Sequence, residues 1–365
     1  MRDVLDRLLG WWEAGEPVGL ATVTGTWSSA PRQPGAAMVV GPGGEVVGSV
    51  SGGCVEGAVY EQCLEVVESG QARTLRYGIS DDDAYEVGLT CGGIIELLVE
   101  RVDRESFPQL PELAAAIGQS RPVALATRLD DARHLVIMPG ERAGTLGADR
   151  VDDAVTDDGR GQLAAGRTGV LHYGPSGERR GEGLSVLVAS FAPPARMLVF
   201  GATDHAAATA RIGSFLGYHV TVCDARPVFA TARRFPSAGQ VVVDWPHRYL
   251  NAEVEAGRID ERTVLCVLTH DPKFDVPVLE VALRLPVAYV GAMGSRRTHD
   301  DRTKRLQEAG LSDADLSRLA SPVGLDLGAR TPEETAVSIA AEIVALRWGG
   351  TGARLTTTDG RIHPE

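Results

Sequence analysis

Two cysteines stand in glycine-rich loops, where a thiol can do chemistry. Cys54 follows Gly52 and Gly53 directly, and an apolar helical pattern begins just after it, so we expect this thiol in the first turn of a helix. The exposed N–H groups and the dipole at a helix N-terminus stabilise a thiolate, which makes a cysteine reactive. The alternative is that Cys54 is a small buried apolar residue, and the sequence leaves both interpretations open.

Cys91 stands in a second loop of the same kind. Gly92 and Gly93 follow it, and a strand-like apolar run begins at Ile94. Because glycine leaves the backbone bare, a large ligand can approach both sulfurs closely, and the two loops are candidates for one pocket. A place in the core is expected for the other three cysteines, which fall in apolar runs: Cys63, Cys223 and Cys266.

A strand, a glycine turn and a helix follow one another from about residue 197, an order typical of nucleotide-binding folds. Gly201 occupies the turn, and Asp224 follows the next strand about 20 residues later, where a ribose-binding acid is expected. The full motif has glycine where this chain has Thr203, whose branched side chain stands where a pyrophosphate normally approaches the backbone. The sequence therefore predicts the fold and leaves nucleotide binding open.

Two further polar groups follow strand-like runs. His270 lies at the carboxyl end of a predicted strand, where open α/β sheets bind ligands, and is either a proton donor or an ordinary loop residue. Ser295, Arg296 and Arg297 begin a predicted helix. Amide donors and two guanidinium groups suit a phosphate or another anion there, and the alternative is a solvated helix end paired with nearby acids.

The elements that must position these residues indicate two α/β domains. Residues 1–192 are expected to form a mixed α/β domain with a small sheet, after an amphipathic helix over Asp3–Glu16. Over residues 193–348, apolar runs alternate with helical segments, which predicts a Rossmann-like, doubly wound parallel sheet. The tail, residues 349–365, is polar and expected to be mobile.

The first domain contains a weak internal echo. Residues 122–127 resemble residues 17–22, and residues 135–147 resemble residues 38–50, either as a second pass over one sheet or by chance. Between about residues 148 and 183 the chain is rich in Asp, Gly and Arg. That composition is typical of a long connection or an irregular edge.

Composition excludes several classes of protein. The 365 residues carry 36 Lys and Arg against 49 Asp and Glu, a formal charge of −13, which argues against a surface that coats nucleic acid. No apolar run approaches the roughly 18 residues of a membrane span. Five widely spaced cysteines without a CxxC pair argue against a structural zinc site and favour a reducing compartment. We therefore expect a cytoplasmic protein without nucleic-acid or membrane partners.

Five ordered motifs together resemble one known family. They are Ser51–Glu56, Leu89–Gly93, Thr269–Asp271, Gly294–Arg297 and Ser321–Glu334. They are similar to motifs of the XdhC/CoxI family of molybdenum-cofactor accessory proteins. The resemblance implies a cysteine-bearing N-terminal domain, a Rossmann-like C-terminal domain and, frequently, a homodimer. It also implies that the protein binds molybdenum cofactor, protects it while a cysteine desulfurase supplies the sulfido ligand, and delivers it to xanthine dehydrogenase or a related hydroxylase.

Residue by residue, the resemblance places the family's glycine-flanked cysteines on Cys54 and Cys91. It thereby makes these thiols candidate molybdenum contacts or sulfur carriers. Their glycines admit a bulky pterin, and the pterin phosphate suits Arg296 and Arg297. The Rossmann glycine motif of the family transfers to Gly201 alone.

The leading hypothesis is a chaperone that binds molybdenum cofactor (molybdopterin) between its two domains. It is not expected to be the hydroxylase itself, because no cysteine cluster is available to ligate an iron–sulfur centre. Two alternatives stay open. One is an NAD(P)-dependent oxidoreductase with His270 or His205 as proton donor, and the other is a scaffold that joins desulfurase and target enzyme without touching the cofactor.

Overall fold

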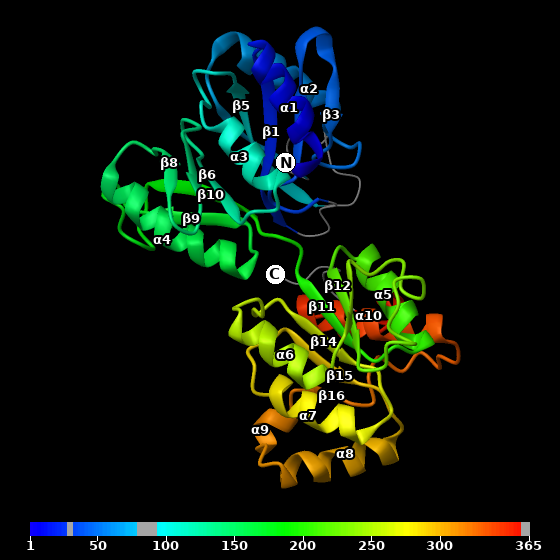
Figure 1. Cartoon of the computed structure of the whole chain (residues 1–365). Helices are drawn as coiled ribbons and strands as arrows, with labels where there is room; N and C mark the ends of the chain where they lie inside the picture. The colour runs from blue at the N-terminus through cyan, green and yellow to red at the C-terminus, as the bar shows by residue number, and fades with distance from the viewer. Residues whose placement is uncertain (28–31, 79–92, 359–365) are drawn as a thin grey trace. The chain divides into compact units, whose positions relative to one another are not determined.

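The computed structural model describes residues 1–27, 32–78 and 93–358 (Figure 1). They form two compact units that divide between Pro193 and Pro194. Within the described residues, the first unit has two antiparallel five-stranded sheets, and the second has one six-stranded parallel sheet. These sheets confirm the predicted α/β class and the Rossmann-like C-terminal half, although the first unit holds two sheets where one small sheet was expected.

The first half of the first unit forms a sheet with the strand order β3-β2-β1-β5-β4. Its elements, in chain order, are α1 (Arg2–Ala14), β1 (Val18–Trp27), β2 (Ala37–Val40), η1 (Pro42–Gly44), β3 (Val46–Gly48), α2 (Glu56–Ser69), β4 (Arg73–Tyr77) and β5 (Ile94–Val102). Helix α1 ends at Gly15, which takes a left-handed conformation. Helix α2 packs its buried side chains against the central strands, β1 and β5.

The second half repeats this arrangement. Its elements are α3 (Leu110–Gly118), β6 (Val123–Arg128), β7 (His134–Ile137), β8 (Arg142–Gly144), α4 (Asp149–Ala165), β9 (Gly169–Tyr173) and β10 (Leu184–Phe191). The strand order is β8-β7-β6-β10-β9, the same order as in the first sheet. The sequence echo is therefore a structural repeat that builds a second sheet, and not a second pass over the first.

The repeat extends to individual residues. Gly48 and Gly144 end equivalent strands with φ of 86° and 95°. A Cβ on Gly48 would lie 2.3 Å from the carbonyl oxygen of Ala37, and one on Gly144 would lie 2.4 Å from that of His134. Both positions thus require glycine for the same two reasons, a left-handed backbone and a close approach to the neighbouring strand.

We expect Gly48→Ala to destabilise the first unit by at least about 1–3 kcal/mol, because alanine there meets both the positive φ and the Ala37 carbonyl. Gly57→Ala is the matched control. Gly57 is exposed inside α2, and in the part of the chain that the structure describes no atom lies within 4 Å of an added Cβ. Alanine there should therefore stabilise the protein by roughly 0.5–1 kcal/mol. Urea unfolding followed by circular dichroism measures both changes, and an unchanged midpoint for Gly48→Ala would contradict the argument.

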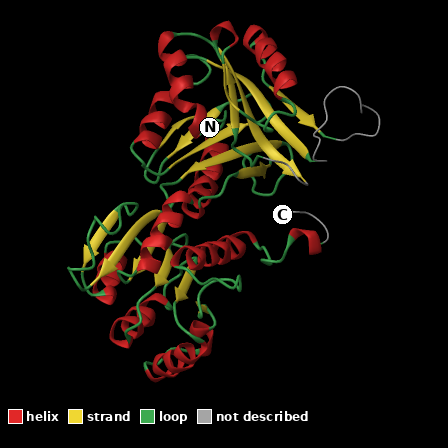
Figure 2. Cartoon of the chain, turned by 90° about the vertical axis from the view of Figure 1, so that its right-hand side faces the viewer, coloured by secondary structure: helices red, strands yellow, loops and turns green. Residues whose placement is uncertain are grey.

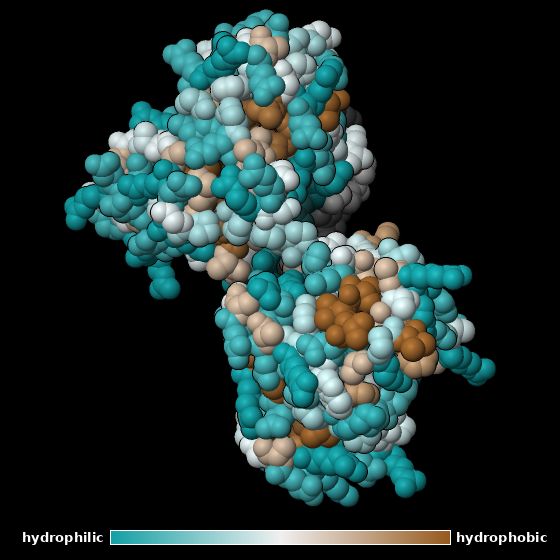
Figure 3. All heavy atoms as spheres, viewed as in Figure 1, coloured by the Kyte–Doolittle hydropathy of each residue, from teal (hydrophilic) through white to brown (hydrophobic). Residues whose placement is uncertain are grey.

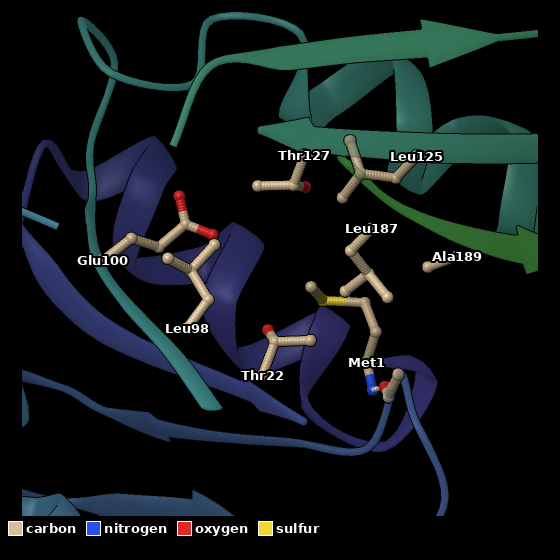
Figure 4. A pocket seen from close by; sticks show the side chains of 9 residues that line it. Met1, Thr22, Leu98, Glu100, Leu125, Thr127, Leu187 and Ala189 are labelled. Atoms are coloured by element: carbon tan, nitrogen blue, oxygen red, sulfur yellow. Dashed lines mark hydrogen bonds between the residues drawn. The ribbon is translucent and has the colours of Figure 1, made fainter. Parts of the chain in front are cut away.

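The two halves share one core, to which α1 and α3 both contribute buried side chains. A cavity of about 10 Å³, the size of one water molecule, lies within it. Thr22 of β1 and Thr127 of β6 point into this cavity from opposite sides (Figure 4). Their cross-strand partners, Leu98 and Leu187, also line it. The cavity is therefore built from equivalent positions of the two repeats.

Of the two expectations for about residues 148–183, a long connection is wrong, whereas β9 does lie at the edge of its sheet. Helix α4 and strand β9 lie there. The helix buries Val151, Val155, Gly159 and Leu163 at every fourth position. A Cβ on Gly159 would come within 2.6 Å of the Ile137 side chain, so this glycine allows α4 to approach the sheet closely. Acidic and glycine residues on the other faces conceal the helical pattern.

The second unit has strand order β13-β12-β11-β14-β15-β16, the order of dinucleotide-binding sheets. Its strands are β11 (Arg196–Phe200), β12 (His219–Asp224), β13 (Gln240–Val243), β14 (Val264–Val267), β15 (Tyr289–Ala292) and β16 (Leu319–Ala320). Its helices are α5 (Asp204–Phe215), α6 (Pro246–Glu255), α7 (Pro272–Ala282), α8 (Arg296–Glu308), α9 (Asp313–Leu316), α10 (Pro332–Trp348) and η2 (Leu355–Thr357). Helices cover both faces of this sheet (Figure 2), with one apolar cluster on each face.

The three cysteines that were predicted to lie in the core are buried there. They are Cys63, Cys223 and Cys266, and burial raises the pKa of each thiol to about 12.

Some apolar side chains are exposed, and brown patches mark apolar residues on the surface of the second unit (Figure 3). Phe215 at the end of α5 and Trp348 at the end of α10 are 86% and 61% exposed. None of the helices among the described residues is long and apolar enough to cross a membrane.

Candidate cofactor site

Cys54 is exposed in the loop between β3 and α2. The helix begins at Glu56 with Val55 as its N-cap, so Cys54 lies before the helix and the expectation of a place in its first turn is wrong. The Cys54 backbone N–H donates to the Ser51 hydroxyl at 2.9 Å. A loop conformation persists up to Val55 because Glu56 binds the backbone of the preceding residues.

The Glu56 carboxylate organises this loop. Its Oε1 accepts hydrogen bonds from the Ser49 hydroxyl at 2.6 Å and the Ser51 N–H at 2.8 Å, and its Oε2 accepts from the Ser51 hydroxyl at 2.5 Å. Four more backbone N–H groups donate to the same two oxygens, those of Val50, Gly52, Gly53 and Val55. A single charged side chain thus holds the backbone on both sides of the thiol in place.

Gly52 and Gly53 leave space beside the thiol. Both are exposed, with φ of 81° and 119°, and an added Cβ would have no atom of the described residues within 4 Å. These glycines are therefore required by the backbone conformation, and the space that they leave is available to a ligand. An exposed cysteine beside bare backbone fits the approach of a bulky group such as a pterin. Cys91 and Gly92 lie outside the described residues, whereas Gly93 is buried just before β5.

The hydrogen bonds to Glu56 predict a pH dependence. Partial burial raises the pKa of Glu56, but the hydroxyls of Ser49 and Ser51 and the loop N–H groups lower it to about 2 overall. Since the ordinary value is 4.5, this carboxylate stabilises the fold above pH 4.5 and loses that effect as the pH falls toward 2. We expect Glu56→Gln to be less thermostable than the wild type at pH 6, with a difference that shrinks toward pH 2. A difference that stays constant down to pH 2 would refute this account.

In the second unit, Gly201 and Asp224 meet at the carboxyl ends of β11 and β12. Gly201 has a φ of 110°, and an added Cβ would lie 3.0 Å from the Leu268 backbone. The Asp224 oxygens accept four hydrogen bonds, from the Ala202 N–H at 2.7 Å and from three N–H groups of Arg226 at 2.8–2.9 Å. Burial alone would raise the pKa of Asp224, and the Arg226 hydrogen bonds lower it instead. Asp224 therefore binds its own chain at the position of a ribose-binding acid.

His270 lies at the carboxyl end of β14 and lines a cavity of about 120 Å³. Helix α8 contributes to the same cavity. Ser295 is the N-cap of this helix and accepts the Thr298 N–H at 3.1 Å. Arg296 and Arg297 are exposed at the start of α8 and are not among the residues that line the cavity. The charged and polar residues that line it besides His270 are Asp275, Thr298, Asp301, Arg302 and Arg305.

Sequence reasoning missed the ion pair behind this cavity. Arg302 and Asp275 have side chains only 3% and 4% exposed, and their closest atoms are 2.9 Å apart. Arg302 also donates to the Met293 carbonyl at 2.7 Å, and the Thr269 hydroxyl donates to Asp275 at 2.9 Å. Burial raises the pKa of Asp275 in spite of these partners. Arg302 sits in a helix so rich in charge that its sequence gives no sign of a buried arginine.

Comparison with known proteins identifies the family. Residues 197–343 match the model of the XdhC Rossmann domain, and residues 11–78 match that of the XdhC and CoxI family. The chain belongs to the XdhC/CoxI family. The resemblance on which the expected cofactor role depends is thereby confirmed at the level of the family.

Relatives of this XdhC/CoxI chain include two curated bacterial proteins. It is 29% identical to the molybdenum cofactor insertion chaperone PaoD of Escherichia coli, over 92% of this chain and 85% of PaoD. It is 27% identical to a probable xanthine dehydrogenase subunit of Bacillus subtilis, over 94% and 96% of the two chains. A crystal structure of a xanthine dehydrogenase from Bacillus halodurans shares the fold, with a TM-score of 0.68 and 24% identity over 97% of each chain.

Proposed function

We propose that this protein binds molybdenum cofactor and delivers it to a molybdenum hydroxylase such as xanthine dehydrogenase, with Cys54 as a sulfur contact. The observation that carries the proposal is the exposed thiol on a loop held by Glu56 and bordered by two glycines with open space beside them. The relationship to an insertion chaperone supports the delivery role.

The chemistry of the loop suits that cofactor. Thiolate is a soft ligand, and a cysteine can bind molybdenum or pass sulfur as a persulfide that a cysteine desulfurase supplies. Gly52 and Gly53 admit the pterin, and we assign the same role to the loop of Cys91, Gly92 and Gly93. Among the described residues no group of three or more His, Cys, Asp or Glu side chains could hold a metal ion.

We also propose the accompanying features that the family resemblance implies. Residues 1–192 and 193–348 act as two domains in a cytoplasmic homodimer, and the exposed apolar side chains of α10 supply area for contact between copies. His270, Ser295, Arg296 and Arg297 are assigned to the anionic end of the cofactor. Gly201 and Asp224 shape the β11–α5 turn in the same unit.

The direct test measures molybdenum and pterin after anaerobic incubation of the purified chain with released cofactor. We expect the wild type to retain cofactor and Cys54→Ser to retain roughly 100-fold less, since even residues behind a metal ligand change affinity by ~10–100-fold. Glu61→Gln, on an exposed position of α2, is the control and should behave as the wild type. No retention by the wild type would reject the function.

Two alternative functions remain distinguishable. An oxidoreductase is disfavoured by the four hydrogen bonds that already occupy Asp224. A scaffold that never touches cofactor predicts that Cys54→Ser supports hydroxylase maturation as well as the wild type does.

A further inference from the structure

A second cavity, of about 330 Å³, lies in the second unit, and His270 is not among the residues that line it. The β11–α5 turn, the segment after β12 and the first residue of α10 form its walls. The lining residues are Ala202, Thr203, Asp204, His205, Arg226, Phe229, Arg234 and Pro332. Because α5 and α10 both begin here, the N-terminal ends of two helices border one space.

Two arginines are held in fixed positions at this cavity. Arg226 donates through Nε and one Nη to Asp224, at 2.9 and 2.8 Å. Arg234 donates to the Ala202 carbonyl at 3.0 Å and to Asp204 at 3.2 Å. Both guanidinium groups lie over the Phe229 ring, 4.7 and 5.6 Å from its centroid. The ring and the backbone carbonyl therefore orient two cations toward the same space before any ligand arrives.

Each guanidinium retains donors for a ligand. Among the described residues, the second Nη of Arg226 and the Nε of Arg234 donate to no protein acceptor. Planar guanidinium groups match the oxygens of a phosphate, and both keep N–H donors for it although each already pairs with a carboxylate.

The usual contacts of a dinucleotide are blocked in the same cavity. The Thr203 hydroxyl accepts the Ala206 N–H as the N-cap of α5, so a side chain occupies the place where a pyrophosphate approaches bare backbone. Asp224, saturated by its own chain, has no oxygen left for ribose hydroxyls. The cavity therefore presents arginine side chains to an anion, where a dinucleotide site presents backbone N–H groups.

We propose that this cavity binds one terminal phosphate monoester through Arg226 and Arg234, and not the pyrophosphate of a dinucleotide. A nucleoside monophosphate and the pterin phosphate of molybdenum cofactor both carry this group on a heterocycle. The first source is independent of the proposed function, and the second rests on it. The experiment below separates the two sources.

Isothermal titration calorimetry of the full chain with adenosine 5′-monophosphate, adenosine, inorganic phosphate and NADH tests the proposal. For a nucleotide ligand we expect the monophosphate to bind at least ~10-fold more tightly than adenosine, because hydrogen bonds between charged groups supply most of the affinity. Arg234→Gln should remove that preference. Arg233→Gln, the same charge change at an exposed neighbour that does not line the cavity, should keep it.

A second variant is expected to strengthen binding, a result that misfolding could not produce. Asp204 is 84% exposed at its side chain and competes with a phosphate for Arg234. We expect Asp204→Asn to strengthen binding of the phosphate-bearing ligand several-fold, by removing a like charge from the site.

The outcomes decide between sources or overturn the site. If no nucleotide binds but Arg234→Gln, unlike Arg233→Gln, loses molybdenum cofactor, the phosphate is that of the pterin. Three results would each overturn the proposal. The first is equal affinity for the monophosphate and adenosine without such a cofactor defect. The others are equal losses of binding in Arg233→Gln and Arg234→Gln, and tighter binding of NADH than of the monophosphate. Because the titrations contain no molybdenum, their failure leaves the Cys54 proposal standing.

Discussion

Arg302→Met is expected to destabilise the second unit by about 3–5 kcal/mol. The substitution leaves the Asp275 carboxylate 4% exposed without its cation, and a buried charge that loses its partner is among the most costly defects in a protein. The Met293 carbonyl and the Ser321 hydroxyl lose a donor as well. Urea unfolding of wild type and variant, followed by fluorescence and circular dichroism, measures the loss.

The double variant Asp275→Leu/Arg302→Met distinguishes the cost of an unpaired buried charge from the contribution of the ion pair itself. It should recover most of the lost stability, because apolar side chains of similar size avoid the cost of burying two charges. The raised pKa of Asp275 supports this expectation. An acid whose pKa rises on folding contributes stability at low pH that disappears as the pH rises through the raised value, so the ionised form is the less favoured one. A double variant as unstable as Arg302→Met would refute this explanation.

Glu56→Ala should release the whole loop around Cys54. Seven described donors lose their common acceptor, and hydrogen bonds to a charged group contribute roughly 1.5–3 kcal/mol each when taken singly. Because such bonds act together and water replaces part of them, we expect a loss of about 2–4 kcal/mol. Hydrogen exchange of the amides of residues 50–53 should accelerate, and cofactor retention should fall with it.

The repeat provides a matched control for Glu56→Ala. Asp152 occupies the position equivalent to Glu56 and accepts the Thr145 hydroxyl and the Leu146 N–H, each at 2.7 Å. Asp152→Ala removes two hydrogen bonds and should lower stability by a smaller amount, about 1–3 kcal/mol, while cofactor retention is unchanged. If both variants lose cofactor equally, Glu56 acts only through global stability and has no special relation to the thiol.

The periodic parts of the chain could be predicted from the sequence. Alternating apolar runs and helices indicated the parallel sheet. Thr331, Pro332 and two acids are typical of a helix start, and α10 begins there with a capping box. Such signals are local, because caps and periodicity depend on residues within one or two turns. Helix α4 escaped prediction because its buried stripe includes Gly159, a residue that usually interrupts helices.

The sequence indicated which residue types lie at the candidate cofactor site, but it did not indicate which side chains contact one another there. Glycines beside Cys54 indicated an accessible sulfur, and the exposed thiol agrees with them. The part played by Glu56 depends on a side chain that folds back and accepts hydrogen bonds from six preceding residues, and no spacing rule predicts this. Arg226 and Arg234 lie outside every motif and reach one cavity only because the segment after β12 returns to the β11–α5 turn.

The repeat in the first unit also provides two copies of one structural framework. Each half contains a helix, three strands, a second helix and two strands, and the halves bury equivalent surfaces against each other. The two copies share one order of elements but carry different residues at equivalent positions. Counted back from Glu56 and Asp152, the first copy has Cys54 where the second has Arg150, so one copy keeps the exposed sulfur while the other is left to serve as its structural support.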